Sequence, residues 1–396
     1  MSVKQRPGSG GGRSGFLPAC LVAGLSLGTG GIAAGPGAGE EVPSVQVVRV
    51  PHGGYQPVAA LDEQGVIHLV VHVGAAELGD LAYLRSADGG KTFAAPLTIT
   101  SEATRACAFG AVRGAQLALG RGGRVHVAWN GPAGKDGVPA PMLYTRLDES
   151  GTRFEPPRDV ITRHHGLDGG GALVADAAGR VWVAWHAPET PGGDESTRRV
   201  FVARSEDDGR TFAPETAISA EGSGVCPCCG IAAFVRGEGL GIVYRTASKG
   251  ENRDTLFCQM APGMAGYQRL DRWKSPACVM STYATAASPR GTLVALESQG
   301  AVRFTLPGEG APPACTTAPG DSPARKHPVI ACNAAGTVLL AWLSGSDSAR
   351  GGVLEWQLFD AERRPLAGST GSVEEVPVWD RPAAVARADG SFVLFY

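Results

Sequence analysis

Segment 226–229, with the sequence C-P-C-C, is the densest group of reactive side chains in the chain. Three interpretations of it stay open. A disulfide from this segment to Cys278 would join two neighbouring structural units, and we favour this interpretation. The thiolates could instead bind a soft metal ion such as copper or zinc together with His186, but no second matched cysteine pair supports such a site. A redox-active dithiol is the third interpretation.

Charged side chains follow this cluster. Arg245 and Arg253 flank one segment, and Asp254 could orient either arginine through a bidentate ion pair. Converging guanidinium groups bind carboxylate or sulfate groups. Together with Arg381 and His186, these residues predict a binding site for an anionic small ligand. The alternative, of equal weight, is that the arginines form ion pairs between structural units.

Overall charge excludes one class of function. The 396-residue chain has 36 basic and 38 acidic side chains, a formal net charge of −2, so no basic field favours nucleic-acid binding. Glycine supplies 57 residues, about twice the usual share, without a collagen period. Because 43% of the residues are hydrophobic, the chain can form a core, and the glycine indicates many turns.

Internal repetition is the strongest structural signal. One unit comprises a short apolar strand, a glycine turn and a second apolar run, and it begins for example at Pro57, Ala115 and Gly171. Seven copies recur at spacings of roughly 45–58 residues, which suits propeller blades. We therefore predict an all-β propeller of seven blades over 44–396. The last copy has only two strands, so we expect the unpartnered strand 44–50 to pair with it and close the ring.

One face of such a propeller gathers polar residues. We call it the rim face: each blade's first strand starts there and its second strand ends there. Alignment of the repeats places His186, Arg245 and Glu297 at the ends of second strands, and Tyr283 and Arg381 at the starts of first strands. Functional loops gather on one side of a rigid scaffold. We therefore expect the site on this face, although solvated strand ends are the simpler explanation for any single residue.

A second motif, S-x-D-x-G-x-T-F, occurs at 86–93 and 205–212, with a partial copy at 147–154. It resembles the Asp-box of sialidase-type β-propellers, a resemblance that implies six blades rather than the seven counted. In such a hairpin, Ser and Asp accept hydrogen bonds from turn amides, glycine adopts a positive φ and the aromatic ring packs beneath the turn. We therefore assign Asp88 and Asp207 a structural role, on the face opposite the rim.

The C-P-C-C string also resembles one found in exported bacterial propellers described as sialidase-like. Sialidases use three arginines on the sugar carboxylate, a tyrosine nucleophile activated by a glutamate, and an aspartate acid/base. The resemblance therefore implies Tyr283 with Glu297 as the nucleophile pair and Asp80 as the acid/base. Gln56 stands where the first arginine of the family is expected, which argues against authentic sialidase activity. The implied anion clamp would be supplied by Arg245, Arg253 and Arg381.

The first 43 residues predict export. Lys4, Arg6 and Arg13 precede an apolar stretch that is diluted by glycine and ends in small residues. A disordered glycine-rich tail is the alternative. The stretch is too interrupted to span a membrane, and the residues before Cys20 fit a lipid-anchor site poorly. Without Cys20 eight cysteines remain, and an exported protein can join them in disulfides.

We thus expect an exported sialidase-like propeller, located in the periplasm, outside the cell or on its surface. It would bind an anionic glycan at its arginine- and cysteine-rich face, with hydrolysis of that glycan as an extension, and without a cofactor. The alternative is a non-catalytic propeller scaffold that binds carbohydrate or protein and uses its cysteines structurally.

Overall fold

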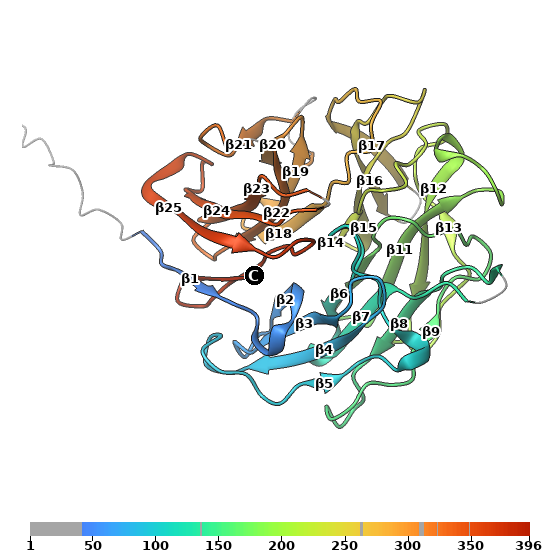
Figure 1. The fold of residues 1–396 in the computed structure, drawn as a ribbon, viewed down its shortest axis with the longest axis horizontal. Helices are drawn as coiled ribbons and strands as arrows, with labels where there is room; N and C mark the ends of the chain where they lie inside the picture. The colour runs from blue at the N-terminus through green and yellow to red at the C-terminus, as the bar shows by residue number, and fades with distance from the viewer. Residues whose placement is uncertain (1–41, 135–136, 262–263, 309–312, 323, 348) are drawn as a thin grey trace, which may run out of the picture. The chain divides into compact units, whose positions relative to one another are not determined.

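Seven small sheets surround a common axis in the computed structural model (Figure 1). The structure describes residues 42–396 except 135–136, 262–263, 309–312, 323 and 348. Nearly all of the predicted export segment therefore lies outside the described residues. The described part belongs to one unit, Val42–Tyr396. No helical segment within these ranges has the length and hydropathy that crossing a membrane requires.

Six sheets have four strands each, and the chain runs through them in order. Blade 1 contains β2 (Tyr55–Leu61), β3 (Ile67–Gly74), β4 (Gly79–Ser86) and β5 (Leu97–Thr98). Blade 2 contains β6 (Gln116–Leu119), β7 (Val125–Asn130), β8 (Met142–Arg146) and β9 (Arg158–Asp159). Blade 3 contains β10 (Ala172–Ala175), β11 (Val181–Pro188), β12 (Arg198–Ser205) and β13 (Thr216–Ala217).

The next three blades repeat this order. Blade 4 contains β14 (Ala232–Arg236), β15 (Gly239–Arg245), β16 (Thr255–Ala261) and β17 (Met264–Asp271). Blade 5 contains β18 (Tyr283–Ser288), β19 (Gly291–Ser298), β20 (Ala301–Thr305) and β21 (Cys315–Thr317). Blade 6 contains β22 (Arg325–Cys332), β23 (Val338–Ser344), β24 (Gly352–Phe359) and β25 (Pro365–Val376).

Blade 7 joins the two ends of the described chain. It consists of β26 (Ala383–Ala386), β27 (Phe392–Phe395) and the N-terminal β1 (Val45–Val48). β1 pairs with β27 in parallel, because β1 must end on the face where β2 of blade 1 begins. The predicted ring closure and the count of seven blades are confirmed. The six-blade alternative is wrong, since the fifth and seventh repeats each form a blade of the ring.

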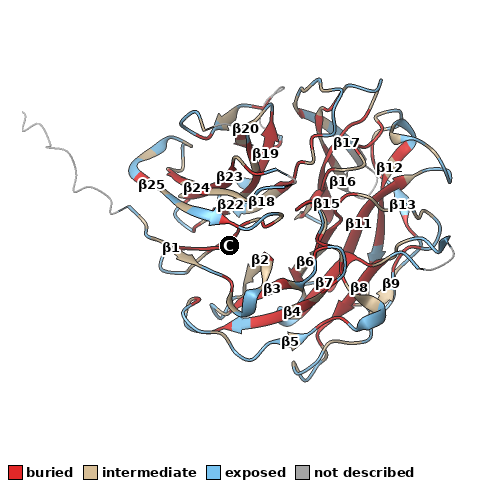
Figure 2. Cartoon of the chain, viewed as in Figure 1, coloured by how far each residue is buried: buried red, intermediate tan, exposed pale blue. Residues whose placement is uncertain are grey.

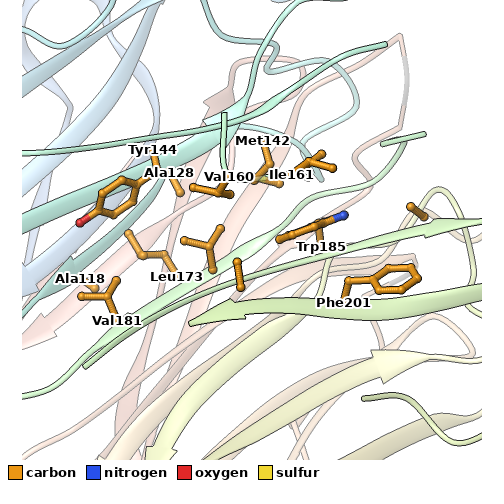
Figure 3. Packing of buried hydrophobic residues seen from close by; sticks show 13 residues of the cluster. Ala118, Ala128, Met142, Tyr144, Val160, Ile161, Leu173, Val181, Trp185 and Phe201 are labelled. Carbon is orange, nitrogen blue, oxygen red and sulfur yellow. The ribbon is translucent and has the colours of Figure 1, made fainter. Parts of the chain in front are cut away.

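The second strand of each blade explains the apolar runs of the repeat. All positions of β7, β15 and β23 are buried, and Figure 2 shows the second strands as mostly buried. A blade is covered on both faces by its neighbours, so its inner strands read as continuous apolar runs rather than alternating ones. Between blades 2 and 3, for example, Tyr144 and Val160 share a buried cluster with Trp185 and Phe201 (Figure 3).

The S-x-D-x-G-x-T-F segments form turns at the ends of β4 and β12. In the first, Ser86 Oγ accepts from the Gly90 amide at 2.8 Å, and Asp88 accepts from the Thr92 amide at 2.9 Å. Gly90 has a φ of 88°, and the Phe93 ring lies 6.3 Å from an aromatic ring of blade 7. The predicted contacts of the turn are confirmed. They lie on the face opposite the rim.

One buried carboxylate fixes the connection between blades 2 and 3. Glu215 is 1% exposed and accepts hydrogen bonds from the backbone amides of Thr162, Arg163 and His164 at 2.8–3.1 Å. Burial alone would raise the pKa of Glu215, but the hydrogen bonds from Thr162 and these amides outweigh it and lower the pKa to about 2. The ionised carboxylate therefore stabilises the folded state.

We predict that Glu215→Gln lowers the free energy of unfolding by about 2 kcal/mol at pH 7, because charge-assisted hydrogen bonds are lost. The folded-state pKa of Glu215 lies below its unfolded value, so this stabilisation is present above about pH 4.5 and is lost as the pH falls through about 2. Urea unfolding at several pH values measures it. The matched control, Glu189→Gln, removes an exposed ion pair with Arg199 and should cost less than about 0.5 kcal/mol. Equal losses in the two variants would contradict the assignment.

Candidate functional site

Most polar side chains on the rim face join neighbouring blades. A hydrogen bond from one residue to the next blade recurs around the ring, and several of these bonds end on backbone oxygens. They run from Gln56 to Ala108 (2.6 Å), from Arg113 to Asp168, from His186 to Cys229 (3.1 Å), from Arg245 to Glu297 (2.8 Å) and from Lys326 to Val279 (2.8 Å). The alignment of repeats therefore placed His186 and Arg245 on the correct face. Their observed contacts are structural.

Arg245 is completely buried among these contacts between blades. Its side chain is fully buried and donates to Ser281 Oγ at 2.9 Å, to the Arg253 carbonyl at 2.7 Å and to the Glu297 carbonyl at 2.8 Å. Its guanidinium lies 4.8 Å from the centre of the Trp273 ring. In this arrangement Arg245 does not reach a ligand outside the protein.

Arg253 and Asp254 form ion pairs with other residues rather than with each other. Arg253 is buried and makes a bidentate pair, with both distances 3.0 Å, to Glu195 of the short helix η5 (Glu195–Thr197). Asp254 pairs with Arg269 at 2.9 Å and accepts from the Trp273 amide. The ion pair between Arg253 in blade 4 and Glu195 in blade 3 is the inter-unit alternative that the sequence left open.

Arg381 and His186 are also held by internal hydrogen bonds. Arg381 donates to the Ala115 carbonyl at 3.1 Å, and burial lowers its pKa to about 10. It lines a cavity of about 250 Å³ along the propeller axis, between the first strands of the blades. Burial and the nearby Arg198 lower the pKa of His186 to about 3. The neutral ring accepts from Arg198 at Nδ1, so Nε2 donates to the Cys229 carbonyl.

The three residues proposed for catalysis lie in two blades that are not neighbours. Tyr283 pairs with Leu296 across β18 and β19, so its side chain and that of Glu297 point to opposite faces of blade 5. Burial raises the pKa of both, that of Glu297 to about 7. Asp80 lies in blade 1, half-exposed, where it accepts from Thr100. The catalytic assignment of this set stays a prediction.

A cavity that the sequence did not identify lies on the rim face, where blade 7 meets blade 1. We call it the rim groove. Its volume is about 590 Å³, and it combines three aromatic rings, an arginine and a buried carboxyl group. The lining residues that matter here are Arg49, Tyr55, Val378, Trp379, Asp380 and Tyr396.

Asp380 is the buried acid of this groove. It is 2% exposed, and its carboxylate accepts from the backbone amides of Gln56 at 2.6 Å and Arg381 at 2.8 Å. Burial nevertheless raises the pKa of Asp380 to about 6. The group can therefore hold or release a proton near neutral pH, which is the property that a general acid requires.

Left-handed backbone conformations recur on the rim face, beside this groove and before other blades. Residues other than glycine with positive φ lead into the first strands of several blades: Gln56 (50°), Ala111 (57°), Met280 (45°), His327 (50°) and Trp379 (62°). Each such conformation costs of order 1–3 kcal/mol and is typical of functional sites. The segment W-D-R-P before the last repeat was the sequence signal that would have led to Trp379 and Asp380.

The cysteine segment forms the disulfide that the sequence favoured. Cys228 is bonded to Cys278, which joins the segments leading into blades 4 and 5. Cys226 and Cys229 are buried free thiols. The sulfurs of Cys226, Cys228 and Cys229 lie within 4.8 Å of one another, which is close enough to share a metal ion. In this structure Cys228 is part of the disulfide, and both ring nitrogens of His186 form hydrogen bonds, so His186 does not complete the set.

Comparisons with known proteins support the fold. No protein-family model matches the chain, and no curated protein matches it. An α-L-arabinanase of Penicillium chrysogenum, solved with arabinobiose, aligns at 12% identity with a TM-score of 0.53, over 82% of this chain and 99% of that chain. A fungal alcohol oxidase of the AA5 family, in complex with copper, aligns at 12% identity with a TM-score of 0.52, over 87% and 70%.

A third structure is less similar. The sialidase of Trypanosoma rangeli has a TM-score of 0.48 at 12% identity, over 78% of this chain and 54% of that chain. The arabinanase and the oxidase, with their different ligands, show at these identities that the propeller fold is shared, and they show nothing more. A function for this chain has to come from its own residues.

The raised pKa of Asp380 predicts a pH dependence of stability. Because its folded-state pKa lies above the unfolded value, the free energy of unfolding should fall as the pH rises from about 4 to about 6. Relative to wild type, Asp380→Asn should gain about 2–3 kcal/mol across this window, measured by urea unfolding. The control Asp347→Asn should change little across this window, because hydrogen bonds lower the pKa of Asp347, so its contribution to stability varies only below about pH 4. A flat difference for Asp380→Asn would contradict the assignment.

Proposed function

We propose that the protein binds an acidic glycan in the rim groove. The observation that carries this proposal is the combination, in one cavity, of the aromatic rings of Tyr55, Trp379 and Tyr396 with the exposed arginine Arg49. Binding sites for small molecules are concave and mostly apolar, with a few polar groups that fix orientation. The rings offer flat apolar surface to the C–H faces of a sugar.

Arg49 supplies the preference for a negative charge. It is exposed and forms no ion pair within the described part of the chain. Its charge acts on Asp380, where it opposes the rise in pKa that burial causes. A free guanidinium at the edge of an aromatic groove suits the planar carboxylate of a uronic or sialic acid, or a sulfate ester. This residue replaces the buried Arg245 and Arg253 as the anion-binding group.

Trp379, in the wall of the rim groove, is held in a fixed position before a ligand binds. Trp379 packs against Phe109 with the ring centres 4.5 Å apart, and its carbonyl accepts from Gln56 at 2.6 Å. The ring therefore loses little freedom on binding. The fold of this chain is shared with an arabinanase whose structure contains arabinobiose, which is compatible with a carbohydrate ligand.

Hydrolysis of the bound glycan is the second candidate function, and the acid Asp380 favours it. With a pKa of about 6, part of the Asp380 population is protonated at neutral pH, and Asp380 lines the same groove. In this role Asp380 would donate a proton to the leaving-group oxygen of the glycosidic bond.

Binding is tested by titrating the purified protein with a panel of uronic, sialic and sulfated oligosaccharides and their neutral counterparts, with calorimetry as the readout. We expect Trp379→Ala to weaken binding of both classes. Arg49→Gln should weaken the acidic ligands by about tenfold and leave the neutral ones unchanged. The matched control is Arg85→Gln, an exposed arginine at the end of β4 on the opposite face. Wild-type affinity in both groove variants would refute the proposal.

Hydrolysis is tested with a fluorogenic sialoside first and then with the acidic oligosaccharides that bind. Asp380→Asn should reduce kcat by about 10²-fold or more while the affinity for the glycan is kept. Tyr283→Phe and Glu297→Gln, assayed in parallel, test the nucleophile pair that the sequence resemblance implied. If wild-type protein binds but does not turn over any of these substrates, the binding function stands and the hydrolytic one is rejected.

A further inference from the structure

Four sulfur atoms form a continuous series from the surface into the core. Cys278 is exposed and Cys228, its disulfide partner, is half-buried. Behind them, the Sγ of Cys226 lies 3.5 Å from the Sγ of Cys228, and the Sγ of Cys229 lies 3.3 Å from that of Cys226. Cys226 and Cys229 are each 1% exposed. A surface disulfide is therefore in van der Waals contact with a buried dithiol.

The backbone holds the inner two sulfurs together. The Cys229 amide donates to the Cys226 carbonyl in a tight turn, and the Cys226 amide donates to the Arg245 carbonyl at 2.9 Å. The amide of Gly230 is bonded to the Ser281 carbonyl of the next blade. Residues of blades 4 and 5 thus fix this turn, and the C-x-x-C spacing brings both side chains to the same side of it.

A buried positive charge faces the dithiol. Arg245 donates only to neutral oxygens, and in the described part of the chain it forms no ion pair with a carboxylate. Burial opposes ionisation of either thiol, but the hydrogen bond between the two thiols and the charge of Arg245 lower the pKa of Cys229. The same hydrogen bond raises the pKa of Cys226. Of the two thiols, Cys229 therefore ionises more readily than Cys226.

We propose that these four cysteines form a thiol–disulfide exchange centre that moves a disulfide between the outer pair, Cys228–Cys278, and the inner pair, Cys226–Cys229. Its substrate is an external disulfide, which the outer pair reduces once the inner pair has become oxidised. This activity is independent of glycan binding, because the rim groove lies at blades 7 and 1 and the cysteines lie at blades 4 and 5.

The transfer of the disulfide from the outer to the inner pair needs no external oxidant or reductant. Ionised Cys229 accepts the proton of Cys226 as Cys226 Sγ attacks Cys228 Sγ, so the Cys226–Cys228 bond forms, the Cys228–Cys278 bond breaks and Cys278 leaves as a thiolate. After Cys229 has lost this proton again, its thiolate attacks Cys226 Sγ, forms the Cys226–Cys229 disulfide and releases Cys228, and the proton ends on the released outer pair. One disulfide and two thiols are present before and after. The outer dithiol can next reduce an external disulfide RSSR to two RSH and reform its own bond.

A trapping variant tests the internal step. In Cys229→Ser, the Cys226–Cys228 intermediate cannot be resolved, so Cys278 should become a free exposed thiol. We expect its labelling by a maleimide under native, anaerobic conditions to rise by about tenfold over wild type, with the Cys226–Cys228 bond identified by peptide mass spectrometry. The matched control, Cys258→Ser, removes another buried thiol of blade 4 and should leave Cys278 unlabelled.

The wild-type chain provides a test that does not depend on the folding of a variant. Incubation with oxidised glutathione should convert it to a form with both the Cys226–Cys229 and the Cys228–Cys278 disulfide, with two glutathione molecules released per chain. The proposal is overturned if Cys226 and Cys229 stay reduced and Cys278 stays unlabelled in Cys229→Ser. It is also overturned if the anaerobically purified protein retains one copper or zinc ion per chain that Cys226→Ser and Cys229→Ser both lose.

Discussion

A blade of this propeller cannot bury its own two faces, and the rest of the structure depends on that constraint. Each sheet needs a neighbour on both sides, so the ring is stable only when the last blade meets the first. The parallel pairing of β1 with β27 provides this closure. The backbone bonds from Val50 to Tyr396 (2.7 Å) and from Phe392 to Ser44 (2.9 Å) extend it beyond the strands.

The same constraint explains what the polar residues of the rim face do. At this face the apolar contacts between blades end, and buried backbone carbonyls of one blade need donors from the next. Long donors such as Arg245 and Lys326 meet that need. A residue that is engaged in this way has little capacity left for a ligand. The groups proposed above for ligand binding and thiol exchange lie where this pattern is interrupted, at the junction of blades 7 and 1 and in the cysteine segment before blade 4.

Much of the fold could be predicted from the sequence. Seven repeats, each with two apolar strands, define the blades, and the unpartnered first strand defines the closure of the ring. The partner of the cysteine segment was also predictable, since Cys278 precedes the next first strand. The site was less predictable. Whether Tyr283 and Glu297 face each other depends on strand register, and a shift of one residue changes the face. Arg49 and Trp379 lie in connections outside the repeat, where no pattern shows that they meet.

The rim groove lies at the junction of the first and last blades. A ligand bound in this groove would therefore prolong the lifetime of the closed ring. Arg49 follows the closing strand β1, Tyr55 begins blade 1, and Trp379 precedes the last two strands. Separation of these segments is the step by which a ring of blades would open. A molecule that touches all three has affinity only for the closed form, so it would slow opening in proportion to its concentration and affinity. The resistance of the protein to proteolysis would then increase with the concentration of the ligand.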